Sequence, residues 1–292
     1  MVAVGALIAS GVFIFAPLLR RLVTTEAARE NAAPIAPGWD ATLDASVPAA
    51  NRLTAAQRSR LLLLSRELIT TRRWEGCGGF VLDPDKKLVI AAQASLLTLA
   101  IPGAPYPGLR AILVYPEGFV AGRVRDMRKW VPSSDSEEPT PELGESWSDG
   151  TVILGWDATN SGAADPSDGV NLVIHEFAHQ FAFDHQLIPP SISRAIIPEG
   201  YFGLERPWER LPDVPNVDAW LRTLRESYER RVAKGESESV LDGYAMTDYS
   251  EFFAVAAEVF FERPQMLKNE DAALYEQLAA LFRQDPAAAS SS

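Results

Sequence analysis

All three histidines of this 292-residue chain lie in one stretch of eleven residues, HEFAHQFAFDH, residues 175–185. His175 and His179 are four positions apart, so both rings project from one face of a helix. Two imidazoles at that spacing bind one zinc ion, and Glu176 reaches a water on the ion instead of the ion itself. The pattern predicts hydrolysis: zinc lowers the pKa of its water, the carboxylate accepts the proton, and the hydroxide attacks an amide carbonyl.

The segment around this pattern, GVNLVIHEFAHQFAF, is apolar around nearly its whole circumference and predicts a buried helix. In the alternative interpretation, the two histidines are buried and bond only to backbone groups. A charged glutamate in the same helix loses its hydration on folding, which is costly unless a metal ion or another partner compensates. Glu176 therefore favours the metal site.

A catalytic zinc site needs three protein ligands and one open position, and two residues compete for the third place. His185 lies ten residues after His175, which is the spacing of the metzincin pattern H-E-x-x-H-x-x-G-x-x-H. The glycine of that pattern permits a sharp turn, whereas this chain has Ala182, and alanine is disfavoured at positive φ. Met246 downstream would correspond to the Met-turn of that class.

The competing ligand lies in a second apolar segment, YAMTDYSEFFAVAAEVFFERP, residues 244–264. Its pattern predicts a buried helix, capped by Thr247 or Ser250, that ends before the proline. Glu251 and Glu258 are seven positions apart and share one face, where a carboxylate needs a cation. Glu251 would complete the zinc site, and Glu258 would hold a ligand histidine by its other ring nitrogen. In the alternative, both glutamates lie at a solvated edge.

The remaining patterns predict an α+β domain, mostly helical with a small sheet. Residues 52–74 have helical spacing, and residues 86–100 open as a strand and continue as a buried helix. Short β-branched runs at 110–120 and 151–157 predict two more strands. Three helical patterns follow Val217, and the two zinc helices are expected to face one another beside the sheet.

The N-terminus predicts a membrane anchor. Val2–Leu19 form an uncharged stretch of 18 residues, mostly apolar, which as a helix spans about 27 Å, near the minimum for a bilayer. Arg20 and Arg21 follow this stretch, so the positive-inside rule directs the rest of the chain to the cytoplasm. We expect a single-pass transmembrane helix over residues 1–23 in the inner (cytoplasmic) membrane, with the catalytic domain facing the cytoplasm.

Three further segments follow the anchor. Residues 24–50 are rich in Ala and Pro and predict a linker, the zinc peptidase domain is expected over 51–286, and residues 287–292 predict a disordered tail. Residues 132–146 are acidic and rich in Pro and Ser, and 189–217 contain many prolines, so both are expected to be loops. The net charge of -12 and the absence of a Lys/Arg cluster argue against nucleic acid as a partner.

Several motifs in a fixed order resemble one family. They are WEGCGG (74–79), IAAQASLL (90–97), YPGLRAILVYP (106–116), GESW (144–147), ADPSDGVNLVIHEFAHQ (164–180) and YAMTDYSEFFAVAAEVFFE (244–262). Between about Leu53 and Pro286 the chain resembles the Mlc titration factor A-like zinc peptidases, which are related to the catalytic domain of anthrax lethal factor.

The resemblance implies a gluzincin. One zinc ion per chain would be held by His175, His179 and Glu251, with Glu176 as general base and Tyr244 as hydrogen-bond donor to the developing oxyanion. It also implies aminopeptidase-like or limited endopeptidase activity on a peptide or protein substrate, and a partner that is a transcriptional repressor controlling sugar uptake.

Two positions depart from the family pattern. The zinc motif is usually followed by Leu-Asp and a short acidic stretch, whereas here Phe181, Ala182 and Phe183 precede Asp184. Many gluzincins carry an acidic residue four positions after the ligand glutamate, and here that residue is Val255. Its side chain cannot support a zinc ligand, which predicts a modest activity.

The alternative function is a non-catalytic, zinc-containing module that binds a partner protein and sequesters it at the membrane. Glu176 and Tyr244 argue against this alternative, because a binding module needs neither of them. The enzyme is therefore the favoured interpretation.

Overall fold

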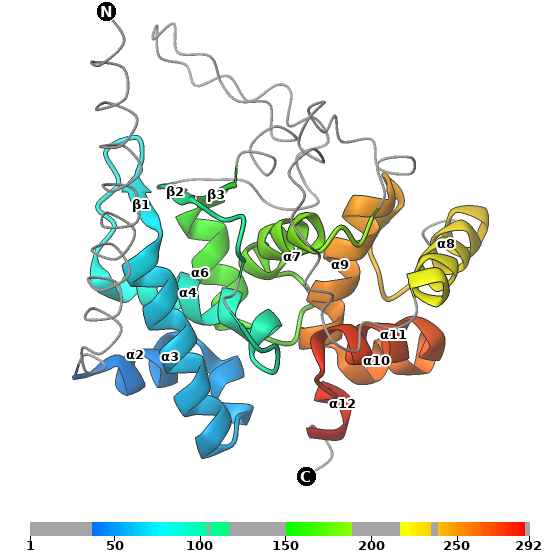
Figure 1. Cartoon of the computed structure of the whole chain (residues 1–292), viewed down its shortest axis with the longest axis horizontal. Helices are drawn as coiled ribbons and strands as arrows, with labels where there is room; N and C mark the ends of the chain where they lie inside the picture. The colour runs from blue at the N-terminus through cyan, green and yellow to red at the C-terminus, as the bar shows by residue number, and fades with distance from the viewer. Residues whose placement is uncertain (1–36, 104–105, 117–149, 189–216, 235–238, 290–292) are drawn as a thin grey trace, which may run out of the picture.

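The computed structural model of the chain describes residues 37–103, 106–116, 150–188, 217–234 and 239–289. In these ranges most elements are helices, which lie beside a small parallel sheet (Figure 1), so the expected α+β class, mostly helical, is confirmed. The expected anchor at 1–23 and the acidic loop at 132–146 lie outside the described residues, as does the loop at 189–217 except for Val217. No helix in the described part combines the length and apolar character that a membrane span requires.

The sheet has the order β1–β2–β3, with strands Arg73–Gly76, Ala111–Tyr115 and Thr151–Gly155. Both strand pairs are parallel, and Ala111 of β2 is the partner of Arg73 and of Thr151. Parallel neighbours need a crossover, and the helix α4 (Pro84–Thr98) lies between β1 and β2 in the chain. Ile112 and Val114 alternate toward the core.

The expected position of the first strand is wrong. Residues 86–100 contain no strand: Asp83 accepts a hydrogen bond from the backbone N–H of Lys86 and caps α4, whose residues Leu88–Thr98 are all buried. A segment buried on every side has no polar face to reveal its helical period. The first strand is instead β1, which follows directly after the helix α3 (Ala55–Thr71).

The expected linker over residues 24–50 is wrong from Trp39 onward. The helix α2 (Trp39–Ser46) and the short 3-10 helix η1 (Pro48–Arg52) occupy this part of the chain. Three apolar side chains at helical intervals pack into the cluster formed with α3 and α4: Leu43, Val47 and Ala50. The alanine-rich composition conceals this spacing, so the folded domain begins before residue 51.

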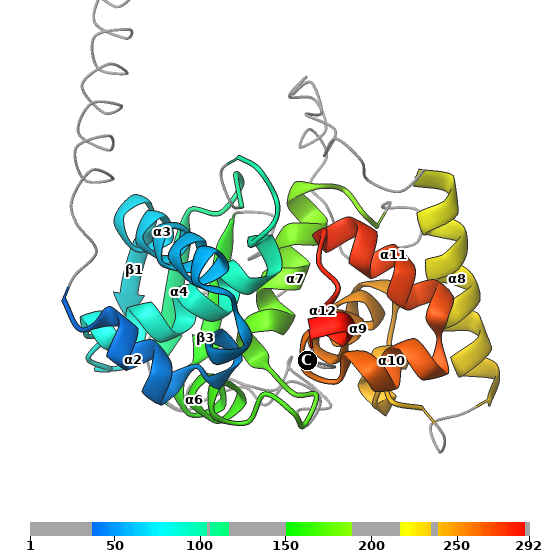
Figure 2. The same cartoon turned by 90° about the horizontal axis from the view of Figure 1, so that it is seen from below.

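The helix α7 (Leu172–Asp184) lies between two parts of the domain (Figures 1 and 2). On one side it meets α4 and the sheet, and on the other it packs against α9 (Tyr249–Glu262). Both helices are buried over nearly their whole circumference, as their apolar patterns predict. The two segments expected to carry the zinc ligands are therefore packed directly against each other.

The C-terminal helices cover α9 (Figure 2). They are α8 (Val217–Lys234), η5 (Gly243–Met246), α10 (Pro264–Glu270), α11 (Ala272–Phe282) and α12 (Pro286–Ala289). Phe282 packs α11 against both central helices, because its ring centroid lies 5.5 Å from that of Phe181 on α7 and 6.3 Å from that of Phe253 on α9. Ala287 is buried, so the expected tail does not begin at residue 287.

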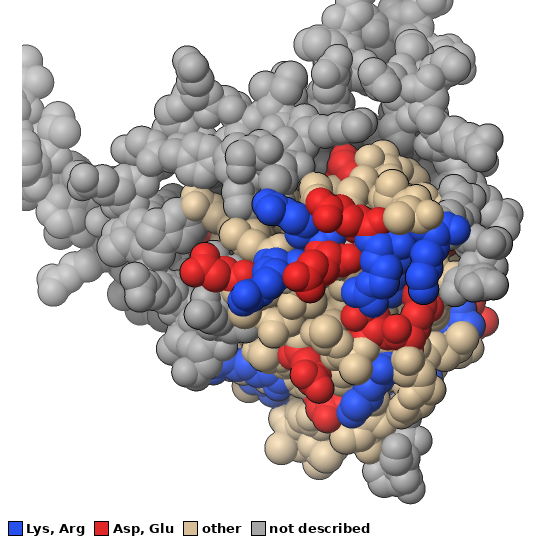
Figure 3. All heavy atoms as spheres, turned by 90° about the vertical axis from the view of Figure 1, so that its right-hand side faces the viewer, with Lys and Arg blue, Asp and Glu red and all other residues tan. Residues whose placement is uncertain are grey.

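The helix α8 is fixed by a buried ion pair and exposes a charged face. Arg231 donates to Asp271 and Glu270 at 2.8 and 2.9 Å. Exposed residues of both signs are intermixed along the helix, as Figure 3 shows for this side of the molecule: Asp218, Arg222, Arg225, Glu226, Glu229 and Arg230. A charged face of this kind is typical of a solvated helix.

Candidate metal centre

The start of α7 is fixed by Asn171, whose side-chain oxygen accepts a hydrogen bond of 3.0 Å from the backbone N–H of Ile174. This N-cap satisfies one of the free donors of the first turn. From there the helix places His175 and His179 on one face, with ring centroids 4.8 Å apart, as the spacing predicts. Both side chains are buried.

The start of α9 is fixed by Asp248, which accepts hydrogen bonds from the backbone N–H groups of Ser250 and Glu251 at 2.8 and 3.0 Å. The cap expected at Thr247 or Ser250 is therefore wrong. Asp248 lies directly before the first helical residue, and its carboxylate accepts two of the free N–H groups of the first turn at once. The cap holds the first turn of α9, and with it Glu251, against α7.

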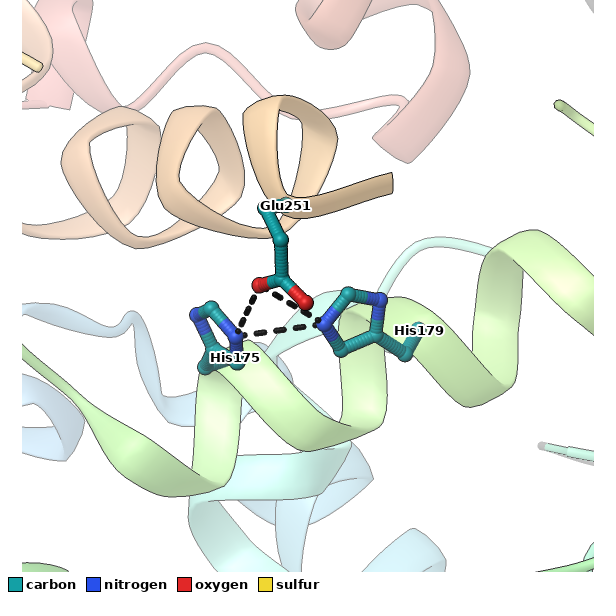
Figure 4. A group of neighbouring side chains, drawn as sticks. All are labelled: His175, His179 and Glu251. Atoms are coloured by element: carbon teal, nitrogen blue, oxygen red, sulfur yellow. Dashed lines mark hydrogen bonds and ion pairs between the residues drawn. The ribbon is translucent and has the colours of Figure 1, made fainter. Parts of the chain in front are cut away.

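Glu251 and the two histidines converge on one point (Figure 4). The Nε2 atoms of His175 and His179 are 3.1 Å apart, and one Glu251 oxygen lies 3.0 Å from the first and 3.4 Å from the second. Tetrahedral zinc with bonds of about 2.0 Å separates its ligand atoms by about 3.3 Å. The donor set therefore fits a divalent metal, and the described residues contain no other group of three His, Cys, Asp or Glu side chains this close.

The charges around the centre favour a cation. Burial acts against the charged form of His175, but Glu251 and Glu258 raise its pKa well above the usual value. Burial likewise acts against ionised Glu251, but His179 and His175 lower its pKa. Without a metal ion, the two carboxylates favour a proton on His175. A metal ion and this proton would therefore compete for Nε2 of His175.

Glu258 occupies the far side of His175. One of its oxygens lies 2.8 Å from Nδ1 of His175, and the other accepts the backbone N–H of Asn171. One turn later, Glu262 accepts from the Asn171 side chain and from the backbone N–H of Gly169, each at 3.0 Å. Burial, followed by the nearby carboxylates, raises the pKa of Glu262 to about 8. The solvated edge considered for Glu258 is thus excluded, because its side chain is buried.

Glu176 and Tyr244 are neighbours of the candidate ligands, because Glu176 follows His175 on α7 and its charge acts on Tyr244. Glu176 is buried on α7, and the Tyr244 ring in η5 has its centroid 6.0 Å from that of His175. Burial and the charges of Glu251 and Glu176 raise the pKa of Tyr244, so its phenol keeps its proton and acts as a donor. The two residues expected to act in catalysis are therefore near the candidate metal ligands.

His185 does not join this group. The helix α7 continues through Ala182 without a turn, so His185 lies about 15 Å further along the helix axis than His175, at about 1.5 Å per residue. The His185 ring packs on Phe181, with centroids 4.4 Å apart. Of the two residues that compete for the third ligand position, the structure places Glu251 beside the histidine pair. The metzincin arrangement with His185 is absent from the described residues.

The two departures from the family pattern have structural explanations. Asp184 accepts hydrogen bonds from the backbone N–H of Gly108 and from the Gln180 side chain, at 3.1 and 2.9 Å, and so ties the end of α7 to the loop before β2. Val255 is buried in the core, and the acidic partner of a ligand histidine comes one turn later, from Glu258.

Three polar residues near the site escaped the sequence analysis as site residues: Asn171, Ser250 and Glu262. Asn171 stands directly before an apolar helical run, the usual place of an N-cap, and this signal was available. The roles of Ser250 and Glu262 depend on contacts between α7 and α9, which no local pattern reports.

Two buried histidines and a glutamate that converge from two packed helices are the arrangement expected of a metallopeptidase. A model of the glucose-regulated metallo-peptidase M90 family matches residues 22–187 and 208–283, and the chain belongs to that family.

Curated relatives support this assignment. Protein slr2042 of Synechocystis sp., described as uncharacterized, is 31% identical over 256 residues, covering 87% of this chain and 86% of the relative. Mlc titration factor A of Salmonella gallinarum is 30% identical over 250 residues, and that of Salmonella typhi is 29% identical over 249 residues. Both comparisons cover 85% of this chain and 86% of the relative. The resemblance to the Mlc titration factor A-like family is confirmed.

Proposed function

We propose that this protein is a zinc peptidase of the gluzincin type, with His175, His179 and Glu251 as ligands of one zinc ion. The observation that carries the proposal is the convergence of two Nε2 atoms and a carboxylate oxygen at 3.0 to 3.4 Å. Imidazole and carboxylate are ligands typical of catalytic zinc, and three of them leave a fourth position open for water or substrate.

Bound zinc would supply a water of lowered pKa and polarise the scissile carbonyl. Glu176 accepts the proton of that water as general base and returns it to the leaving amine as general acid. Its burial on the apolar α7 keeps bulk water away from this proton transfer. Tyr244 retains its proton and donates a hydrogen bond to the oxyanion that develops on the carbonyl oxygen.

The substrate is a peptide or protein, which is the class that a metallopeptidase family implies. The relatives named Mlc titration factor A, together with the resemblance, support a transcriptional regulator as a partner. The uncharged stretch Val2–Leu19 followed by two arginines supports a single-pass anchor in the inner membrane, with the peptidase domain facing the cytoplasm.

The ligand set is tested by zinc content. We expect about one zinc per molecule, by elemental analysis after dialysis, in the full-length wild type and in His185→Ala, and a loss of zinc in Glu251→Gln. Loss of zinc in His185→Ala alone would replace Glu251 by His185 as the third ligand. A wild type without zinc would refute the proposal.

The catalytic role is tested by Glu176→Gln, which removes the base and leaves the three ligands in place. General bases contribute about 10²- to 10⁴-fold to rate, so peptide hydrolysis should fall by that order while zinc content stays unchanged. Zinc-loaded wild type that hydrolyses no peptide in a broad library, but still binds a partner protein, would identify the non-catalytic binding module instead.

A further inference from the structure

Ser250 contacts the second ligand histidine from α9. Its Oγ atom lies 3.0 Å from Nδ1 of His179, on the side of the ring opposite the convergence point. Ser250 is half-buried in the first turn of α9, and the His179 side chain is 1% exposed. The contact therefore lies inside the interface between α7 and α9 and not on the outer surface.

The distances show which nitrogen of His179 faces the proposed metal position. Nε2 faces the Nε2 atom of His175 at 3.1 Å and a Glu251 oxygen at 3.4 Å, so it is the nitrogen offered to a metal. A metal-bound imidazole is neutral and carries its hydrogen on the other nitrogen. Nδ1 of His179 is then a buried donor, and the Ser250 hydroxyl oxygen is its acceptor.

The cap at Asp248 places this acceptor. Asp248 accepts the backbone N–H groups of both Ser250 and Glu251, so one aspartate holds the backbone from which both side chains extend. One helix thus presents the third candidate ligand and the partners of both histidines. Glu258 contacts Nδ1 of His175, and Ser250 contacts Nδ1 of His179.

We propose that Ser250 is a positioning residue that accepts the Nδ1–H of His179 and so fixes the tautomer and ring orientation with which this histidine binds the metal. The inference rests on the proposed zinc site. Partners of this kind orient the ligand and tune the metal, and their removal typically weakens metal binding by about 10- to 100-fold. A hydroxyl is a weaker acceptor than a carboxylate, so about 10-fold is expected for Ser250.

The test measures the zinc dissociation constant of the full-length protein by competition with a chelator. Ser250→Ala removes the acceptor and suits a helix, so the fold should be retained. Ser250→Thr keeps a hydroxyl on the same carbon and should restore zinc binding to within about threefold of the wild type. The matched control is Ser65→Ala, because the buried Ser65 hydroxyl donates only to the Leu61 carbonyl within α3.

A second readout uses Co²⁺ in place of zinc, because its visible absorption reports the geometry of the ligands. The bands should shift in Ser250→Ala and match the wild type in Ser250→Thr and Ser65→Ala. Wild-type zinc affinity in Ser250→Ala would overturn this inference alone, as would an equal weakening in the alanine and threonine variants. A wild type that binds no zinc would overturn the proposed function, and this inference with it.

Discussion

His175 and Glu258 form a buried pair, with 2.8 Å between the imidazole Nδ1 atom and a carboxylate oxygen. The same glutamate accepts the backbone N–H of Asn171, the residue that caps α7. Glu258 therefore holds both the ring of His175 and the start of the helix that carries it. A carboxylate behind a ligand histidine raises the basicity of the nitrogen that faces the metal.

We predict that Glu258→Gln weakens zinc binding by about 10- to 100-fold, because glutamine provides an uncharged acceptor in place of a carboxylate. The measurement is the zinc dissociation constant by chelator competition. Glu276→Gln is the control, because it removes the same charge from an exposed position on α11. Equal affinities in the two variants would show that the carboxylate does not tune the histidine.

The candidate metal ligands could be predicted from the sequence, because each of them stands out in the local spacing of its own segment. His175 and His179 are one helical turn apart, and Glu251 is a charge within an apolar helical run, so each stands out in its own segment. The choice between Glu251 and His185 needed the packing of α7 against α9. Only the three-dimensional structure shows that α7 continues through Ala182 and carries His185 away from the other histidines.

The fold was less accessible where burial removes periodicity or composition conceals it. The helix α4 is buried on all sides, so the apolar run at its start predicts a strand instead of a helix. The helix α2 follows a segment rich in alanine and proline, and the contribution of this region to the core comes from Leu43 in α2 and Val47 after it, whose burial depends on α3 and α4. Both errors concern contacts distant in sequence, which local patterns do not encode.

A second prediction concerns Asn171. Asn171→Ala removes the cap of α7, which is worth about 1 kcal/mol. It also leaves one buried oxygen of Glu262 without its donor, a further cost of about 1 to 3 kcal/mol, while the other oxygen keeps the backbone N–H of Gly169. The free energy of unfolding should therefore fall by about 2 kcal/mol or more. Thr54→Ala removes the comparable cap of α3 at an exposed site and should cost about 1 kcal/mol. Urea unfolding of the two variants makes the comparison.

Asn171→Ala and Thr54→Ala together also distinguish an effect on the metal site from a general loss of stability. Asn171→Ala should also weaken zinc binding, since the first turn of α7 leads directly to His175, whereas Thr54→Ala should leave the zinc dissociation constant unchanged. An Asn171 variant with wild-type zinc affinity would mean that Glu258 alone orients His175.

A third prediction concerns the contact between Gly108 and Asp184. A side-chain carbon at Gly108 would lie 2.2 Å from the Asp184 oxygen that accepts the Gly108 N–H, so Gly108→Ala should displace that carboxylate and destabilise the fold. Asp184→Ala removes the obstacle but leaves the Gly108 N–H without its acceptor, about 1 to 3 kcal/mol.

The two changes should therefore be strongly non-additive. In the double variant, Gly108→Ala should cost less than it does in the wild type, with a coupling of about 0.5 to 3 kcal/mol in a double-mutant cycle measured by urea unfolding. Asp157→Ala, at an exposed position of the helix α6 (Trp156–Ala164), serves as the second member of a control cycle. Additive energies in the Gly108 and Asp184 cycle would contradict the close approach seen in the structure.

The last prediction concerns His185 and acid. Burial lowers the pKa of His185 to about 4, from an ordinary value of 6.5. Between these two values the unfolded chain binds a proton that the folded protein excludes, so stability falls as the pH drops from about 6.5 to about 4. Above about pH 6.5 the contribution of His185 to the free energy of unfolding does not change with pH. Below about pH 4 the destabilisation has reached its full size. A shift of this size corresponds to at most about 3 kcal/mol.

His185→Gln removes this titration. The measurement is the free energy of urea unfolding of metal-free protein at pH 7.5, 6, 5 and 4.5, with a chelator present so that zinc release does not contribute. The difference between variant and wild type should shift in favour of the variant by about 1.4 kcal/mol per pH unit across the window, whatever its value at pH 7.5. A difference that is independent of pH would show that His185 takes up its proton in the folded protein as readily as in the unfolded chain, because the packing on Phe181 then leaves the ring open to water.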